Sequence, residues 1–298
     1  MSSSAQHREN VAIIGLGKSG TAVGHLLRQA GYPVTAVTSR SPATMRERVR
    51  HTGGRTFTAE GNAEAASLAT CIIIATPDDA IAAVCADISR LHGFKPGDKV
   101  IHLSGAGGLD LLEPARRDGA SVASIHPLQS FADVEAAIRN IPGSRFGVTA
   151  HEDLREWSFG LVRELGGIPF FVPDKAKPLY HAAACMASNY LTTLIHMVEE
   201  TYLSFGMSRD EAIQAFWPLV LGTLKNIETR GSIGALTGPI SRGDRGTIEQ
   251  HIRLLRTALP HYLPAYCEMG LLTVDLALQK KTLSPEMAEA IRAILTAA

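Results

Sequence analysis

Three polar side chains recur at a spacing of four residues in the segment HAAACMASNY, residues 181–190. They are His181, Cys185 and Asn189, and residues four apart on a helix lie on the same face. Histidine changes its charge near neutral pH, so this polar stripe could be a catalytic face that handles protons. The alternative is structural, because the intervening alanines favour close helix packing and buried polar groups are usually hydrogen-bonded. For Cys185 the structural interpretation is favoured, since a free cysteine is commonly a small buried apolar residue.

A glycine-rich turn near the start of the chain predicts a diphosphate site. The segment GLGKSG has the glycine spacing of dinucleotide-binding proteins, and it lies between an apolar run, Val11–Gly15, and a predicted helix, Ser19–Ala30. The first glycine allows a tight turn, the second lets backbone N–H groups approach phosphate, and the third lets helix and strand pack closely. The helix N-terminus adds a partial positive charge. We predict that the cofactor contacts Gly15, Leu16, Gly17, Lys18, Ser19 and Gly20, with Lys18 pointing to solvent or to a phosphate.

The end of the second predicted strand, Pro33–Thr38, indicates which dinucleotide is bound. NAD is usually held through its ribose 2′-hydroxyl by an acidic residue about twenty positions past the glycines. Here Ser39, Arg40 and Ser41 stand in that place and no acidic residue does. A guanidinium and two hydroxyls suit a 2′-phosphate, so the sequence predicts NADP(H) rather than NAD. An ordinary solvated arginine is the alternative interpretation.

Apolar runs without alternation predict strands that are covered on both faces. Such strands form a mostly parallel sheet between helices, as in a doubly wound Rossmann-type α/β domain. The runs are Val11–Gly15, Pro33–Thr38, Cys71–Thr76, Lys99–Ser104, Ser121–Ile125, Arg145–Ala150 and Ile168–Val172. Beyond the linker Val172–Pro178 the strand patterns stop. We expect two domains: a dinucleotide-binding Rossmann domain over residues 1–173, and an all-helical substrate and dimerisation domain over residues 174–298.

Ligands of open α/β sheets bind at the carboxyl ends of the strands. Thr76 and Pro77 follow one predicted strand, and Ser104 and Gly105 follow another, so these four residues are expected near the nicotinamide half of the cofactor. The pair Asp78–Asp79 is expected to cap the next helix rather than to catalyse.

Two features interrupt the predicted helices of the second half. Pro218 lies within a helical pattern over Ser208–Thr229 and is expected to kink or end that helix. The segment Gly231–Asp244 is rich in glycine and is expected to be a loop with short helical turns at most.

The composition of the chain argues against several classes of protein, including nucleic-acid-binding, membrane and secreted proteins. The 29 basic and 29 acidic residues balance, which argues against strong attraction to nucleic acid or to an anionic membrane. The four cysteines are scattered, so neither a metal site nor a disulfide framework is expected, and a cytoplasmic location fits. The first ten residues are polar, which argues against a signal peptide. The apolar run Ala182–Phe205 is interrupted by polar residues, so no membrane span is expected.

A nucleotide-binding sheet followed by helices, one of them long, resembles the 6-phosphogluconate dehydrogenase-like superfamily, which includes pyrroline-5-carboxylate reductase and ketopantoate reductase. The closer resemblance is to a branch of Rossmann-like NADP oxidoreductases with a C-terminal domain of unknown function. The segments that resemble its signatures are GLGKSG, ATPDDAI, HLSGA, HPLQSF, HAAACMASNYLTTL and LTGPISRGD. The resemblance implies a generic dinucleotide-dependent oxidoreductase, and because such helices interlock two chains in relatives we predict a homodimer. Our first hypothesis for the activity is an NADP(H)-dependent oxidoreductase that transfers a hydride to or from a small carbonyl or imine substrate.

The resemblance also bears on the polar stripe. In several dehydrogenases of the superfamily the long helix carries a Lys, followed four residues later by an Asn that holds the substrate. Asn189 fits the Asn place, but Cys185 occupies the Lys place, and a thiol carries no permanent positive charge. We therefore expect His181 to be the general acid and Asn189 to orient the substrate. His126 and Arg242 are expected to line the pocket between the domains, where the arginine could clamp the carboxylate of a keto acid.

Other functions stay open at this point. The missing lysine is compatible with a non-catalytic protein that binds NADP and senses its level, because a fold does not determine a function. A deazaflavin-linked reductase would use the same type of sheet. His126 is equally consistent with an ordinary turn histidine at the end of a strand.

Overall fold

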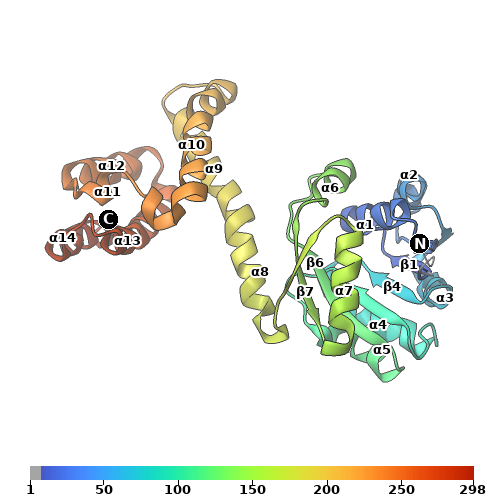
Figure 1. Ribbon diagram of the computed structural model, residues 1–298. Helices are drawn as coiled ribbons and strands as arrows, with labels where there is room; N and C mark the ends of the chain where they lie inside the picture. Colours follow the sequence, from blue (N-terminus) through green and yellow to red (C-terminus); the bar gives the residue numbers. More distant parts are fainter. Residues whose placement is uncertain (1–7) are drawn as a thin grey trace, which may run out of the picture. The chain divides into compact units, whose positions relative to one another are not determined.

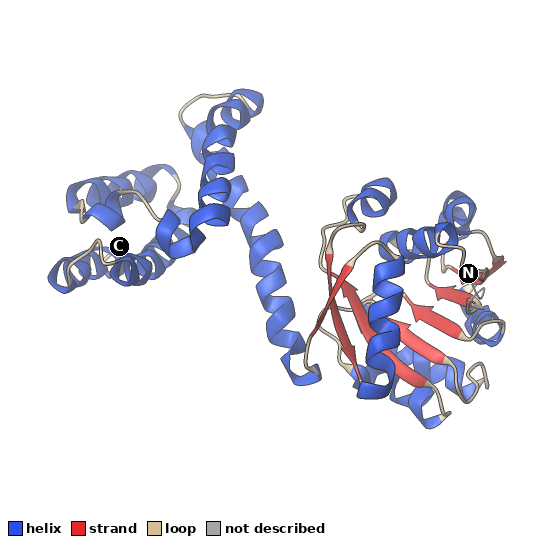
Figure 2. Ribbon diagram, viewed as in Figure 1, coloured by secondary structure: helices blue, strands red, loops and turns tan. Residues whose placement is uncertain are grey.

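The computed structural model describes residues 8–298, which form two compact units that meet in sequence between Asn189 and Tyr190. The described strands all lie in the first unit, and the second consists of helices and their connections (Figure 2). The predicted domain boundary at residue 173 lies just after the last strand. The first compact unit extends further and includes the next helix. The functional division of the chain at residue 173 stays a prediction. The prediction that the polar N-terminus is not a signal peptide falls mainly on residues 1–7, outside the described range.

One sheet forms the centre of the first unit. Its strands are β1 (Val11–Ile14), β2 (Val34–Thr38), β3 (Arg55–Phe57), β4 (Cys71–Ile74), β5 (Lys99–His102), β6 (Ser121–Pro127), β7 (Arg145–Ala150) and β8 (Ile168–Phe171). Their order is β3-β2-β1-β4-β5-β6-β7-β8, and all neighbours are parallel except β6 and β7 (Figure 1). The first six strands follow the order of doubly wound dinucleotide-binding domains, so the predicted Rossmann-type, mostly parallel sheet is confirmed.

Helices pack on both faces of this sheet. One core includes α1 (Lys18–Gln29), α6 (Val134–Asn140) and α7 (Glu152–Glu164), with α2 (Pro42–Thr52) at its margin. The opposite core includes α3 (Asn62–Ser67), α4 (Ile81–Arg90) and α5 (Glu113–Arg117). Successive residues of a strand enter opposite cores, as Ile13 and Ile14 of β1 do. Both faces are therefore apolar, which explains the continuous apolar runs of the sequence.

The short strand β3 was not among the predicted strands. It has three residues, of which Arg55 and Thr56 are exposed, and it pairs only with β2. An edge strand with exposed polar residues has no apolar run, so the pattern that identified the other strands is missing here.

Helical turns run without interruption from Lys177 to Ser204. They comprise α8 (Lys177–Cys185), a π-helical turn (Met186–Tyr190) and α9 (Leu191–Ser204). Turns of the π type are rare and often mark functional positions. Asn189 lies in this turn.

The second unit contains α9, α10 (Arg209–Ala235), α11 (Pro239–Arg242), α12 (Arg245–Ala258), α13 (Leu263–Lys280) and α14 (Pro285–Thr296). Its core is formed mainly by α11 to α14. Pro218 was expected to kink or end its helix; it does not end it, because α10 continues past it. Pro218 and Gln214 are both exposed, so water can satisfy the carbonyl group that the proline leaves without a donor.

The predicted loop Gly231–Asp244 is more helical than expected. It includes the end of α10 and the whole of α11. The helix axis of α10 breaks at Gly231, whose φ of +71° lies in the left-handed region that glycine adopts without strain.

No helix within residues 8–298 is long and apolar enough to cross a membrane. In the same range, no three His, Cys, Asp or Glu side chains are grouped closely enough to hold a metal ion.

Candidate functional site

The glycine turn after β1 leaves no room for side chains at two of its positions. Gly15 has a φ of +107°, and a Cβ there would lie 2.9 Å from the carbonyl oxygen of Ala75. A Cβ on Gly20 would lie 2.2 Å from the Gly15 carbonyl oxygen. Gly17 is exposed, and a Cβ there would meet only the Ala75 carbonyl oxygen, at an ordinary contact distance of 3.8 Å. Thr38 holds the turn in place, because its Oγ1 accepts a hydrogen bond of 3.2 Å from the Gly15 N–H. The turn therefore packs tightly on β4 and opens at Gly17.

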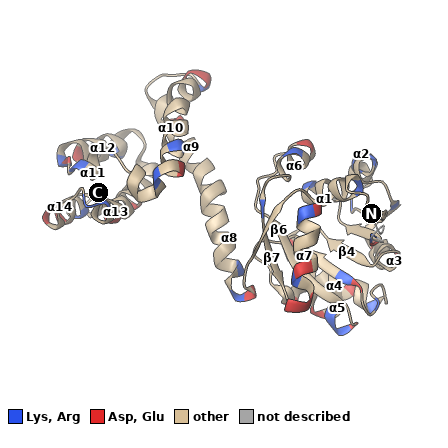
Figure 3. Cartoon of the chain, viewed as in Figure 1, with Lys and Arg blue, Asp and Glu red and all other residues tan. Residues whose placement is uncertain are grey.

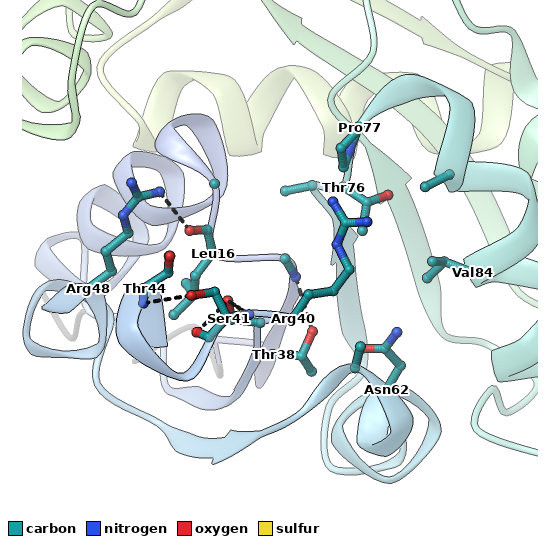
Figure 4. Close-up of a pocket in the computed structure, with 16 residues that line it drawn as sticks. Leu16, Thr38, Arg40, Ser41, Thr44, Arg48, Asn62, Thr76, Pro77 and Val84 are labelled. Carbon is teal, nitrogen blue, oxygen red and sulfur yellow. Dashed lines mark hydrogen bonds between the residues drawn. The ribbon is translucent and has the colours of Figure 1, made fainter. Parts of the chain in front are cut away.

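A first pocket of about 310 Å³ lies beside this turn, at the carboxyl ends of β1, β2 and β4 (Figure 4). Eight of the predicted cofactor residues line it: Gly15, Leu16, Gly17, Ser39, Arg40, Ser41, Thr76 and Pro77. The other lining residues are Thr38, Thr44, Arg48, Ala59, Asn62, Ala75, Ala80 and Val84. The glycine turn and the segment 39–41 are thus brought to one hollow.

Three polar side chains around the first pocket have buried atoms that meet no hydrogen-bond partner among the described residues. These atoms are Arg48 Nε, Asn62 Oδ1 and Thr76 Oγ1. Figure 4 shows their side chains together with Arg40 around the same hollow. Buried polar groups normally have partners, so this pocket offers unsatisfied donors and acceptors to a polar ligand.

The remaining predicted cofactor residues lie elsewhere in the first unit. The Lys18 Nζ donates to the Phe131 carbonyl at 3.2 Å, where the sequence predicted solvent or a phosphate as its surroundings. Ser19 lies in the first turn of α1, and Gly20 is buried beneath the glycine turn. Ser104 and Gly105 follow β5 and lie next to a second group of predicted residues.

A second pocket of about 690 Å³ brings three of the four predicted catalytic residues together. They are His126 from the end of β6, His181 from α8 and Asn189 from the π-helical turn. The other lining residues are Leu128, Gln129, Ser130, Phe131, Tyr180, Ala183, Ala184, Cys185, Ala187 and Ser188. Arg242 belongs to the second unit, on α11, and its place in the pocket stays a prediction.

The two imidazole rings meet at Gly105. Their centroids are 5.9 Å apart, and the rings are nearly perpendicular. A Cβ on Gly105 would lie 2.5 Å from Cδ2 of His181 and 2.9 Å from Nε2 of His126. The backbone of Gly105 therefore lies directly against both rings. On the far side of His181, the Cys185 Sγ is 3.9 Å from Nδ1.

Burial determines the charge of His126. It is the largest cause that lowers the pKa of this histidine to about 4, followed by the nearby charges of Lys177 and His181. Burial also raises the pKa of Tyr180 to about 12. At neutral pH both groups are uncharged, and the Tyr180 hydroxyl lies 2.8 Å from His126 Nδ1. An uncharged His126 is a poor acid there, so the candidate proton donors among the lining residues are His181 and the protonated hydroxyl of Tyr180, of which His181 is the one that the sequence predicts.

Two sequence families match the chain. Residues 1–127 match the family described as a Rossmann-like domain, and residues 144–273 match the family described as a domain of unknown function, DUF2520. The chain is a Rossmann-like domain followed by a DUF2520 domain. The resemblance inferred from the sequence motifs is thereby confirmed. No curated protein matches the sequence.

Solved structures share the fold of this Rossmann-like and DUF2520 combination. Protein BF3122 from Bacteroides fragilis is 19% identical, with a TM-score of 0.71, and the match covers 92% of this chain and 98% of that protein. A reductive aminase from Aspergillus terreus, in complex with NADPH and ethyl levulinate, is 18% identical, with a TM-score of 0.60 and coverage of 98% and 93%. A pyrroline-5-carboxylate reductase from Coxiella burnetii is 18% identical, with a TM-score of 0.58 and coverage of 97% and 99%.

The second pocket draws on both family matches. His126 belongs to the Rossmann-like match, whereas Tyr180, His181 and Asn189 belong to the DUF2520 match. The DUF2520 match also contains a residue that sequence reasoning missed. Lys177 is one turn before His181 and extends the four-residue spacing of the polar stripe. It is buried, and this burial lowers the pKa of its ammonium to about 8. The spacing could have identified it, but the surrounding prolines and lysines suggested a linker.

The prediction that the pair Asp78–Asp79 caps the next helix was wrong. The pair Asp78–Asp79 was expected to cap α4, but α4 has Ala80 at its N-cap position and no side-chain cap. Asp78 instead accepts a hydrogen bond of 2.6 Å from the Ser104 hydroxyl. Arg48 and Asn62 of the Rossmann-like domain were also missed, because polar residues on helices give no sequence signal that separates a pocket from solvent.

Proposed function

We propose that the chain is an NADP(H)-dependent oxidoreductase that transfers a hydride to or from the C=O or C=N bond of a small molecule. One observation carries this proposal: the ends of adjacent strands bear a glycine cradle with unsatisfied polar groups and a pair of imidazoles packed on Gly105. Ligands of open α/β sheets bind along this edge. The Aspergillus terreus reductive aminase, which has the same fold, was solved with NADPH bound.

The first pocket fits the adenosine half of such a cofactor. Gly15 and Gly20 allow the tight turn, and the open space at Gly17 lets backbone N–H groups approach a diphosphate. Arg40, Ser39 and Ser41 would hold the 2′-phosphate, as the sequence predicts. The unsatisfied Arg48 Nε, Asn62 Oδ1 and Thr76 Oγ1 would supply the further polar contacts that a nucleotide needs.

The second pocket supplies the proton and the orientation. When bound, the nicotinamide supplies or accepts the hydride. In the reducing direction His181 donates a proton to the substrate oxygen or nitrogen, and Asn189 orients the substrate. In the tautomer of uncharged His126 that accepts at Nδ1 from the Tyr180 hydroxyl, the Nε2–H of this ring is a neutral hydrogen-bond donor.

The lining of the second pocket favours a substrate that is uncharged near its reacting bond. None of its described lining residues is Lys, Arg, Asp or Glu. A keto acid would need a cationic partner for its carboxylate, and Arg242 is the residue proposed for that role. A small aldehyde, ketone or imine needs only the neutral donors of His126, Asn189 and Gln129.

The cofactor assignment is tested by a substitution of Arg40. We expect NADPH to raise the melting temperature of the wild-type chain more than NADH does, by mass action on the folded state. Arg40→Ala should weaken NADPH binding roughly 10- to 100-fold, the value of one to two charge-assisted hydrogen bonds, and should leave NADH binding nearly unchanged. Thermal shift and calorimetric titration measure both effects.

Arg46→Ala is the matched control, because Arg46 is an exposed arginine on α2 that does not line the first pocket. It should bind NADPH as the wild type does. Equal affinity of the wild-type chain for the two cofactors would contradict the 2′-phosphate site. Absence of binding to either cofactor would overturn the proposed function as a whole.

We also propose that two copies of the chain pair through their helical units. Large apolar side chains are exposed along α10, with Leu219 71% exposed. The others on this helix are Ile213, Trp217, Leu221, Leu224, Ile227 and Ile233. Ile213, Trp217, Leu221, Leu224 and Ile227 follow helical spacing and share one face of α10, and an exposed apolar face of this extent is typical of an interface. Light scattering is expected to give about twice the chain mass of 31.8 kDa.

Leu221→Glu should shift this mass toward that of one chain, because it places a charge within the apolar face. Lys225→Glu, on the same helix at an exposed charged position, should not. A wild-type chain that is monomeric at micromolar concentration would be incompatible with the pairing.

A further inference from the structure

Lys177 is the only Lys or Arg among residues 8–298 that is buried, with 1% of its surface exposed. It begins α8 and is the one Lys, Arg, Asp or Glu of this helix, and Figure 3 shows charged residues at the start of α8 and none along the rest of it. Burial of an unpaired ammonium is costly, and a methionine of similar length would fill the space without a charge. The contacts of the ammonium show where that charge is directed.

The ammonium joins three elements of the first unit. Its Nζ donates to the carbonyl oxygen of Ser104 at 3.1 Å and to the hydroxyl of Ser124 at 2.7 Å. The Ser124 hydroxyl donates to the same Ser104 carbonyl at 3.1 Å. Ser124 lies on β6, and Ser104 lies in the segment Leu103–Gly108, here called the β5 loop. Lys177 thus links the start of α8 to β6 and to the β5 loop.

Other bonds hold the same loop from its opposite side. The Ser104 hydroxyl donates to Asp78 Oδ2 at 2.6 Å and accepts from the Gly107 N–H at 2.9 Å. The Ser104 N–H donates to Nδ1 of His102 at 3.1 Å, so Nε2 of that ring carries the proton and donates to the Gly108 carbonyl at 3.0 Å. Lys177 completes this set, because it holds the Ser104 carbonyl.

The loop matters because Gly105, the residue after Ser104, touches both rings of the second pocket. We propose that Lys177 is a positioning residue whose buried ammonium holds the β5 loop against His126 and His181, in the arrangement that the proposed hydride transfer requires. The residue does not line the second pocket, so it acts through the loop and the rings rather than on the substrate. The expected effect of Lys177 on kcat rests on the proposed function. Its expected effects on the pKa of His126 and on the order of the β5 loop do not.

The charge of Lys177 acts on the rings as well. Burial lowers the pKa of His102 and of His126 to about 4, and the Lys177 ammonium is the second cause in both. Asp78 and Asp174 attract the ammonium, and His181 faces His126, so these groups share the same local field. Loss of the ammonium should therefore raise the pKa of His126, an effect that a purely space-filling residue would not have.

Lys177→Met tests the proposal, with Lys175→Met as the matched control because Lys175 is exposed two residues earlier. In the Lys177 variant, NMR titration should show a raised pKa for His126, and the Gly107 amide should exchange faster with solvent. With NADPH and a carbonyl or imine substrate, kcat should fall about 100-fold, as expected for displaced reacting groups. NADPH affinity should fall less than kcat, because Lys177 does not line the first pocket, and the control should match the wild type in every measurement.

Ser124→Ala keeps the Lys177 ammonium but removes one of its acceptors. If the Lys177→Met variant does not fold, this second variant tests the positioning role of Lys177. It should speed Gly107 exchange and lower kcat, in the same direction and by less. Variants at Lys177 and Ser124 that leave His126 titration, Gly107 exchange and kcat at control values would refute the positioning role. If the wild type fails to bind NADPH, the proposed function fails, while titration and exchange still decide the role of Lys177.

Discussion

His181→Gln is expected to lower kcat roughly 10²- to 10⁴-fold, the range that a positioned general acid contributes. Glutamine keeps the polarity of the site but cannot deliver a proton. His126 cannot substitute, because burial and the Lys177 charge lower its pKa to about 4 and keep it neutral at neutral pH. NADPH affinity should stay at the wild-type value, since His181 does not line the first pocket. Steady-state kinetics and calorimetric titration separate the two effects.

Cys185→Ala is the matched control for this prediction. Its thiol lies 3.9 Å from His181 Nδ1 on the same helix face, so the variant changes the surroundings of the ring and keeps the imidazole. We expect a small change in kcat, because no proton transfer is assigned to the thiol. If His181→Gln retained full turnover, or if the Cys185 variant lost as much activity, the assignment of His181 as the acid would be wrong.

Most strands of the first unit could be predicted, because burial of a strand on both faces leaves a pattern within the residues of that strand. Residues such as Ile13 and Ile14 enter opposite cores, so a strand buried on both faces shows as a continuous apolar run. The direction of β7 relative to β6 was not predictable in this way, since an apolar strand has the same pattern whichever way it runs. Pro218 shows the limit of a local rule: its effect on α10 depends on whether water reaches Gln214.

In the candidate site, too, the residues that could be predicted are those with a local sequence pattern, and the residues that could not are those whose partners are distant in the sequence. The polar stripe was found because a four-residue spacing is visible in the sequence, and the glycine turn because its context is local. Asp78 was taken for a helix cap, since nothing near it in the sequence reveals that Ser104, 26 residues later, is its partner. Lys177 was missed for a similar reason: its acceptors lie 73 and 53 residues away, and only the fold brings them together.

Acidification is expected to destabilise the fold between about pH 6.5 and pH 4, because His102 and His126 stay neutral in the folded chain. Their pKa is lowered from 6.5 to about 4, mainly by burial. In this window the unfolded chain binds more protons than the folded chain, so the free energy of unfolding falls as the pH falls. A shift of this size corresponds to about 3 kcal/mol for each histidine at most.

His126→Asn isolates the contribution of one ring, because other titrating groups act equally on the variant and on the wild type. The quantity to measure is the difference between their free energies of unfolding, obtained from urea titrations at neutral pH and at about pH 4.5. The wild type should lose stability relative to the variant as the pH falls, by up to about 3 kcal/mol. A difference that is independent of pH would mean that His126 titrates in the folded chain as it does in the unfolded chain. The claim that burial and the Lys177 charge keep this ring neutral would then be refuted. The argument that His181, rather than His126, donates the proton would fail with it.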